Sequence, residues 1–367
     1  MIDTTVQEIY DIHPLMNWGL IIVSFPFFTG LSAGSFTLST LAYVFGRKEY
    51  KVVSRHAVLM ALVLLFLALL TLMADMTQPT RLLLGYIRPN MTSMFSWATF
   101  LVTGYAILSL IYAWFIFRKD DKRAKLLGMM CIPVALGVHA DTGFVFGLNK
   151  GTPLWHTALM PMLFLVSALT SGIALLVFVT VIMDKFKPKE KKIDPTLIFS
   201  MGNMVVFFLV TEAFLLISDV TTMLYSGTDE RDAVMLWLTG PLMVTFLGIE
   251  VIAGIVIPLL LYTHPKTGKS LLGQAVASAL VVIGTYAMRY NVIVGGQTIP
   301  KTGSGLVELG ETVGFRVYSE TADIMIVLGI MITGAIMFAL AVKLFPIIVD
   351  FLSEKIYGTK PSEQEGH

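Results

Sequence analysis

Nine long stretches of mostly apolar residues make up most of this chain, and they leave little choice of fold. A helix that crosses a bilayer needs about 20 such residues. Charged residues are only 14% of the 367 and the mean hydropathy is +0.78, whereas soluble domains carry about 25% charged residues. We therefore predict an all-α membrane protein with about nine transmembrane helices. The predicted spans are 17–46, 55–78, 95–118, 124–148, 155–184, 195–226, 232–263, 270–296 and 323–350.

Seven of the ionisable residues inside these spans stand out. They are Asp75, His139, Asp141, Glu212, Asp219, Glu250 and Arg289. A charge at bilayer depth costs about 2.5 kcal/mol or more, so such residues usually face a bundle interior and mark a path for a proton, an ion or a substrate. Counted from the outer ends of their spans, Glu212 and Glu250 are expected about 20 and 25 Å deep, and the other five within about 12 Å. The pattern predicts an outer polar layer with two glutamates leading toward the inner face.

The loops show a clear bias in positive charge, which sets the orientation. The loops after spans 1, 3, 5 and 7, counted with the span ends beside them, and the C-terminal tail carry 18 Lys and Arg residues, and the opposite side carries 6. Positive loops stay in the cytoplasm, so we predict an N-terminus outside and a C-terminus inside the cytoplasmic (inner) membrane. Residues 1–17 contain no Lys or Arg, so they do not resemble a signal peptide. The net charge of +1 argues against nucleic acid as a partner.

Two short motifs recur at similar spacing. Ala74-Asp75-Met76-Thr77 is similar to Ser218-Asp219-Val220-Thr221, and Gly137-Val138-His139-Ala140 to Gly284-Thr285-Tyr286-Ala287. Units of four helices repeat in parallel, about an axis along the membrane normal. The expected organisation is two four-helix bundles related by a parallel repeat, plus one C-terminal helix. The boundaries are 1–148 and 149–296 for the bundles, 297–322 for an outer loop, and 323–367 for the ninth helix and a cytoplasmic tail.

Histidine and cysteine positions limit the redox groups that this chain could hold. His139 is the one histidine well inside a span, whereas a bis-histidine haem needs two that face each other. Cys131 is the single cysteine, so no iron–sulfur cluster is expected. We predict no haem, no cluster and no metal in this chain.

Each ionisable residue also has a structural interpretation. His139 can both donate and accept a proton near neutral pH, but it could equally be a core histidine with its hydrogen bonds satisfied. Asp75 could pair with Arg81, Glu250 could be held by packing contacts, and Arg289 could be a structural counter-ion for Asp219 or Glu212. Glu212 and Asp219 are seven residues apart and share a helix face.

Several motifs resemble those of one family. The chain reads Met288-Arg289-Tyr290-Asn291-Val292-Ile293-Val294-Gly295-Gly296-Gln297 in the eighth span, and the first span contains Asn17-Trp18 and Phe27-Phe28-Thr29-Gly30-Leu31-Ser32-Ala33-Gly34. His139 and Pro153-Leu154-Trp155-His156 follow in order. Together they resemble the NrfD/PsrC family of quinone-interacting membrane subunits, and most closely its HybB/DsrP-like branch, over almost the whole chain.

The resemblance implies a non-haem subunit of a respiratory oxidoreductase complex, not catalytic alone, that binds menaquinol or menaquinone near the outer face. The implied partner is a ferredoxin-like iron–sulfur subunit that docks there and exchanges electrons with the quinol. A multihaem cytochrome c and further membrane subunits are additional candidates. Expected quinol-binding residues are His139, Asp75, Asp141 and Arg81. Glu212, Asp219 and Glu250 are expected to form a proton relay, with Arg289 as structural counter-charge.

Two other classes fit the same spans. A secondary transporter also uses a parallel repeat and buried charges, although no two spans are broken by Gly or Pro at matched positions. A purely structural anchor for a peripheral enzyme would leave the deep glutamates unexplained. Solute counterflow without partners would favour the transporter, and a bound menaquinone with a stoichiometric iron–sulfur protein would favour the quinol subunit.

Overall fold

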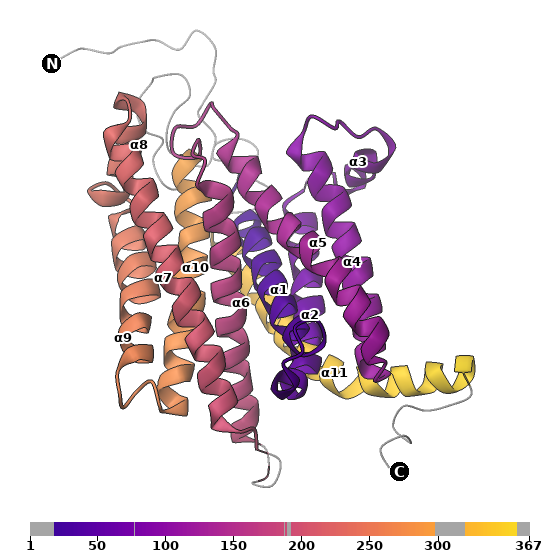
Figure 1. The fold of residues 1–367 in the computed structure, drawn as a ribbon. Coiled ribbons are helices and arrows are strands. Elements are labelled where there is room, and N and C mark those ends of the chain that lie inside the picture. The colour runs from indigo at the N-terminus through magenta and orange to yellow at the C-terminus, as the bar shows by residue number, and fades with distance from the viewer. Residues whose placement is uncertain (1–17, 77, 187, 189–191, 298–319, 358–367) are drawn as a thin grey trace, which may run out of the picture.

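Every regular element in the described part of the computed structural model is a helix (Figure 1). The structure describes residues 18–76, 78–186, 188, 192–297 and 320–357. Among these residues, nine helices are long and apolar enough to cross a membrane. The predicted all-α membrane fold is confirmed. The spans are α1 (Leu20–Tyr43), α2 (Lys51–Asp75, continuous with the short helix Lys48–Tyr50), α4 (Met94–Phe117), α5 (Asp121–Gly147), α6 (Met160–Lys185), α7 (Pro195–Tyr225), the π-helical η4 (Val244–Val256) continued by α9 (Ile257–Thr263), α10 (Leu271–Gln297) and α11 (Glu320–Tyr357).

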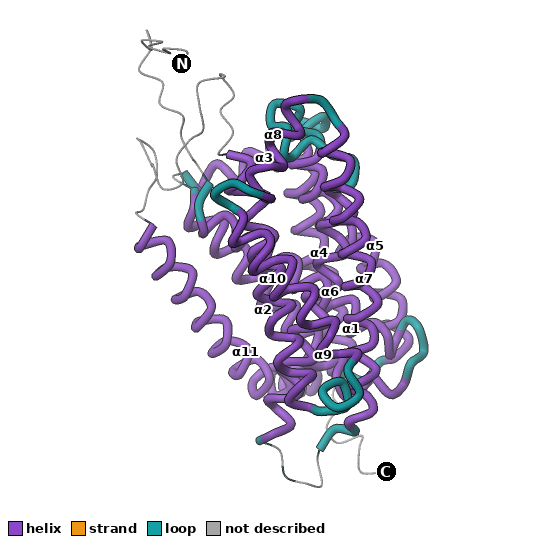
Figure 2. Tube along the Cα trace, turned by 90° about the vertical axis from the view of Figure 1, so that its left-hand side faces the viewer, coloured by secondary structure: helices purple, strands orange, loops and turns teal. Residues whose placement is uncertain are grey.

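Helices α1, α5, α6 and α10 lie at the centre of the packing. Helix α2 packs on α1, α4 on α5, α7 on α6, and η4 and α9 on α10. Helix α1 packs on α6, α10 packs on both, and α11 lies along the outside against α2 and α1 (Figures 1 and 2). Helices α1 and α6 both start at the end drawn uppermost in Figure 1, as a parallel repeat requires. The repeat and the bundle boundaries stay predictions.

Helices α1 and α6 come into close backbone contact at a pair of glycines. A Cβ atom on Gly34 would lie 2.2 Å from the carbonyl oxygen of Ala168, and one on Gly172 would lie 2.6 Å from the Cα of Gly34. Small residues let transmembrane helices come into backbone contact. Gly34 and Gly172 therefore set the distance between α1 and α6.

We expect Gly34→Ala to destabilise the protein by about 1–3 kcal/mol, the usual cost of overpacking a core. The new methyl group would meet backbone atoms of α6, which cannot rotate away as a side chain can. The measurement is the thermal midpoint of the detergent-purified protein. Gly329→Ala in α11 is the matched control, because a Cβ there meets nothing within 4 Å. Equal thermal midpoints for the two variants would contradict a close contact between α1 and α6 at Gly34.

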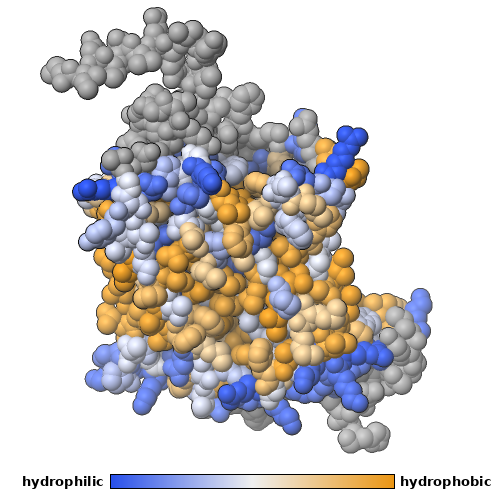
Figure 3. Space-filling model, turned by 45° about the horizontal axis from the view of Figure 1, so that its top comes forward, coloured by the Kyte–Doolittle hydropathy of each residue, from blue (hydrophilic) through white to orange (hydrophobic). Residues whose placement is uncertain are grey.

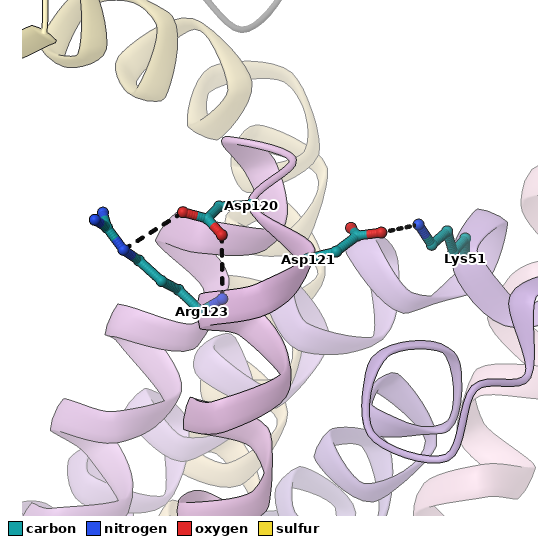
Figure 4. Close-up of polar contacts among 4 residues, drawn as sticks. All are labelled: Lys51, Asp120, Asp121 and Arg123. Atoms are coloured by element: carbon teal, nitrogen blue, oxygen red, sulfur yellow. Dashed lines mark hydrogen bonds and ion pairs between the residues drawn. The ribbon is translucent and has the colours of Figure 1, made fainter.

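The surface matches a bilayer environment. Figure 3 shows a belt of hydrophobic residues between two hydrophilic ends. At the lower end, Lys51 at the start of α2 donates to the Oδ2 of Asp121 at 2.5 Å, and Asp120 caps α5 by accepting from the backbone N–H of Arg123 at 3.1 Å (Figure 4). These side chains are largely exposed, and exposed ion pairs contribute little stability. Their role is to fix where α2 and α5 begin.

The predicted seventh span, 232–263, is wrong at its start. Residues Thr228–Leu238 form a separate short helix, α8, and the membrane span begins only at Val244. Gly240 and Pro241 lie in the break, and proline cannot continue a helix because it lacks the N–H group and its ring clashes with the preceding turn. The expected interfacial segment 79–94 contains two short helices, Pro79–Leu83 and α3 (Leu84–Ile87). Most of the expected outer loop, 298–319, lies outside the described residues.

Candidate functional site: a buried polar cluster between the bundles

Arg289 of α10 is the largest fully buried side chain in the described residues. Its Nη2 donates to the hydroxyl of Ser167 at 2.6 Å and to the carbonyl of Phe164 at 3.2 Å, both in α6. The guanidinium also lies 3.9 Å from the centre of the Phe164 ring. No ion pair to Arg289 is present among the described residues. Hydrogen bonds and the ring therefore hold it in place.

Three other ionisable residues lie around Arg289, each on a different helix. The charges of Glu212 in α7 and Glu250 in η4 act on Arg289 and on each other, and Arg289 acts on His139 in α5. All four are buried, with at most 7% of each residue exposed. We call these four residues the central cluster: His139, Glu212, Glu250 and Arg289.

Glu250 is connected to α10 by a short chain of hydrogen bonds. Asn291 donates through Nδ2 to the Oε2 of Glu250 at 2.6 Å, and Thr245 donates through its hydroxyl to the Oδ1 of Asn291 at 2.6 Å. Because η4 begins at Val244, Glu250 is only six residues from the upper start of its helix. The expected depth of about 25 Å is therefore wrong, since that depth was counted from residue 232. Glu250 lies beside the upper part of α10, in the same cluster as Arg289.

His139 is fully buried, and neither ring nitrogen has a hydrogen-bond partner. A buried polar group without a partner is rare and requires an explanation. Gly30 of α1 faces the ring, and a Cβ atom there would lie 2.5 Å from Nε2. The absence of a side chain on Gly30 therefore leaves room at this edge of the imidazole.

The other expected site residues lie outside the central cluster. Asp219 accepts from the hydroxyl of Thr157 at 2.5 Å, and its second oxygen is buried without a partner. Asp141 also has one buried oxygen without a partner. Asp75 is the last residue of α2 and is partly exposed. The backbone of Arg81 lies in the short helix Pro79–Leu83, and its side chain is outside the described part of the structure.

A series of aromatic rings covers the cluster toward the upper end. Trp18 stacks on Trp155 with ring centres 5.8 Å apart, and Phe146 packs edge-on against both. Phe146 also lies 5.6 Å from Phe164, the ring under Arg289. The indole of Trp155 donates to the carbonyl of Val292 in α10 at 2.6 Å. These rings separate the cluster from the upper surface.

The end of α10 positions this cover. The Gln297 side chain accepts from the backbone N–H of Trp18 and donates to its carbonyl, each at 2.9 Å. A Cβ atom on Gly296 would lie 1.9 Å from the Nε1 of Trp155, and one on Gly295 would lie 2.7 Å from Leu242. Gly295 and Gly296 thus leave room for two loops to pack on the end of α10. The same helix carries Arg289 of the central cluster, and Asn291, which bonds to Glu250.

We expect Gly296→Ala to cost about 1–3 kcal/mol of stability, because the added methyl group would displace the Trp155 indole and break its bond to Val292. Thermal midpoints of the purified protein measure the loss. The loss should shrink in a Trp155→Phe background, since that change removes the atom nearest the methyl group. Gly137→Ala, where a Cβ meets only Leu101 at 3.4 Å, is the helical control. An equal loss in both backgrounds would show that Trp155 is not the cause.

Two polar residues of interest were not predicted to carry a role. Asn291 stands in the family motif, but its bond to Glu250 depends on the packing of η4 against α10. Asp323 in α11 is 3% exposed and its charge acts on Tyr286. Asp323 could have been chosen from the sequence, since it is an ionisable residue at the start of the predicted span 323–350.

Among the described residues, no group of three or more His, Cys, Asp or Glu side chains could hold a metal ion.

The nine spans among the described residues, with the buried cluster that α5, α7, η4 and α10 form, define a multi-pass membrane protein with a polar interior. Residues 11–301 match the family described as Polysulphide reductase, NrfD. Because the match covers more than half of the chain, this protein belongs to the NrfD family, as the motifs predicted.

Curated relatives agree with the family assignment. The chain is 30% identical to the Hdr-like menaquinol oxidoreductase integral membrane subunit of Archaeoglobus fulgidus, over 92% of this chain and 87% of the relative. It is 30% identical to a selenate reductase subunit of Mesobacillus selenatarsenatis, over 77% and 75%. It is 24% identical to a protein of Haemophilus influenzae named as an NrfD homolog, over 77% and 95%. The first two are named as subunits of oxidoreductases, and the third carries the family name.

Proposed function

We propose that this chain is the menaquinol- or menaquinone-binding membrane subunit of a respiratory oxidoreductase complex. It exchanges electrons between the quinone pool and a ferredoxin-like iron–sulfur subunit that docks at the outer face. The family and the name of the Archaeoglobus fulgidus relative support the class of substrate. The single structural observation that supports the site is His139, buried in an apolar bundle with both ring nitrogens unpartnered.

The chemistry of His139 fits a quinol head group. A bound menaquinol supplies two electrons and two protons on oxidation, and the iron–sulfur partner takes the electrons. A neutral imidazole can accept a hydrogen bond from a hydroxyl and then its proton. Asp141, two residues further along α5, has a buried oxygen without a partner and is the candidate to take the proton on. Asp75 and Arg81 complete the proposed quinol-binding residues.

The proposed orientation follows the distribution of Lys and Arg. The upper end of Figure 1 then faces outward, and the lower end, where α2 and α5 begin with Lys51 and Asp121, faces the cytoplasm. The chain would lie in the cytoplasmic membrane with its N-terminus outside. A partner docking at the upper end would contact the loops that cover the central cluster.

The buried carboxyls form the proposed proton relay. Asp219 and Glu212 lie seven residues apart on α7 and are both buried, so they share a face that points into the protein. The charge of Glu212 in α7 acts on Glu250 in η4. Arg289 supplies the counter-charge that a carboxylate in this environment needs.

Purification of the complex from native membranes tests the proposal. We expect a stoichiometric iron–sulfur protein, bound menaquinone, and menaquinol-dependent reduction of the partner's clusters. The same preparation in liposomes, without partners, tests the transporter alternative. Solute counterflow by the isolated chain, with no bound quinone and no partner, would overturn the proposal.

A further inference from the structure

The two glutamates of the central cluster have different surroundings. Glu250 accepts a hydrogen bond of 2.6 Å from Asn291. Glu212 has one buried oxygen without a partner. Thr170 lies against Glu212, but its hydroxyl donates to the carbonyl of Val166 at 2.8 Å. The two carboxyls are therefore not equivalent.

Asn291 acts as a donor toward Glu250. The hydroxyl of Thr245 has two acceptors, the Oδ1 of Asn291 at 2.6 Å and the carbonyl of Leu242 at 2.9 Å. The shorter of these contacts, to Oδ1, turns the amide NH₂ group of Asn291 toward the carboxyl. A hydrogen bond from an amide is roughly twice as strong to an ionised carboxylate as to a neutral acceptor. Asn291 and Thr245 together therefore favour the charged form of Glu250 over that of Glu212.

Charge balance limits how many of these groups are ionised at once. The charged groups that face the two glutamates are Arg289 of α10 and, beyond it, His139 of α5. An uncompensated buried charge is strongly destabilising. One arginine can balance one carboxylate, and an imidazole beside a guanidinium stays neutral because like charges repel. The second carboxyl must therefore hold a proton.

We propose that Glu250 is the ionised carboxyl that balances the charge of Arg289 at longer range and that Glu212 carries the mobile proton, with Asn291 as the positioning residue that sets this difference. This inference refines the proposed proton relay, and it rests on the proposed function only for the use of the Glu212 proton in turnover. Whether Glu212 is protonated can be measured without quinol and without a partner, so the two proposals can fail separately.

The test is labelling of the full chain in native membranes with dicyclohexylcarbodiimide, an apolar reagent that adds to protonated carboxyls. Fragment-ion mass spectrometry of the labelled peptides then assigns the adduct to a residue, because α7 also carries the buried Asp219. We expect label on Glu212 and not on Glu250 in the native chain. In Glu212→Gln we expect Glu250 to stay unlabelled, because it must stay ionised to balance Arg289.

Asn291→Leu removes the donor and should lower the ratio of label on Glu212 to label on Glu250 by about tenfold, the value of one charge-assisted hydrogen bond. Thr245→Val should shift the ratio in the same direction by less, and it serves as the milder variant if Asn291→Leu does not fold. Thr285→Val is the matched control, because its buried hydroxyl bonds only to the carbonyl of Val281 in its own helix. Label on Glu250 in the native chain, no label on either carboxyl, or an unchanged ratio in both variants would overturn the proposal.

Discussion

Replacing His139 with phenylalanine is expected to lower menaquinol-dependent reduction of the iron–sulfur partner by about 10²-fold or more, the usual effect of losing a general base. The variant should still assemble, because His139 makes no hydrogen bond that phenylalanine would break. Phenylalanine also fills the buried volume, so no cavity forms. The measurement is the initial rate of cluster reduction by a soluble menaquinol analogue, at matched amounts of assembled complex.

Two companion variants separate a chemical role from a packing role. Gly30→Ala leaves His139 in place but puts a methyl group 2.5 Å from the present position of its Nε2, so the ring must move and the rate should also fall. His156→Gln changes a histidine that lies nearer the upper surface and bonds to the carbonyl of Gly147; its rate should stay near that of the native complex. Native kinetics in His139→Phe would remove His139 from the site.

Much of the fold could be predicted because the bilayer imposes one rule on every span. Runs of about 20 apolar residues locate helices whatever their neighbours are, and eight of the nine predicted spans begin within seven residues of the observed helices. The seventh span failed for a local reason. The residues of α8 continue the apolar pattern across Gly240 and Pro241, and hydropathy does not register the break in the backbone.

The wrong start of the seventh span also made the predicted depth of Glu250 wrong. Counting from residue 232 places Glu250 deep in the membrane, and the expected graded path from the outer to the inner face depends on that depth. The observed start at Val244 brings Glu250 into contact with Asn291 and near Arg289. Six of the seven ionisable residues expected inside the spans are buried, and Asp75 is partly exposed. Which of them meet depends on helix packing, and a single sequence does not contain that information.

The direct contacts of Arg289 also could not be predicted from a single sequence. Its position inside a span predicts a buried charge with a carboxylate partner, yet Ser167, Phe164 and Met288 provide its direct contacts in the described structure. The carboxyls act on it only at longer range. The sequence therefore predicted the counter-charge and could not have predicted the hydrogen bonds that hold it.

Replacing Arg289 with leucine is expected to cost about 3–5 kcal/mol of stability, the range for breaking a buried charge network. The loss has two sources. The hydroxyl of Ser167 and the carbonyl of Phe164 lose a charged donor, and the ionised carboxyl among Glu212 and Glu250 loses the cation that balances it. Thermal midpoints of the purified chain measure the effect. Arg289→Lys should be intermediate, because an ammonium keeps the charge but cannot lie flat over the Phe164 ring or reach both oxygens as a fork.

A compensating triple variant decides which source dominates. Arg289→Leu combined with Glu212→Gln and Glu250→Gln removes the stranded carboxyls along with the cation, so most of the stability should return if charge imbalance is the main cost. Met288→Leu is the local control, since it changes only the sulfur contact of Nη1 and should leave the midpoint nearly unchanged. If the triple variant is as unstable as Arg289→Leu, the hydrogen bonds to α6, rather than the balance of charge, explain why an arginine is buried between the two bundles.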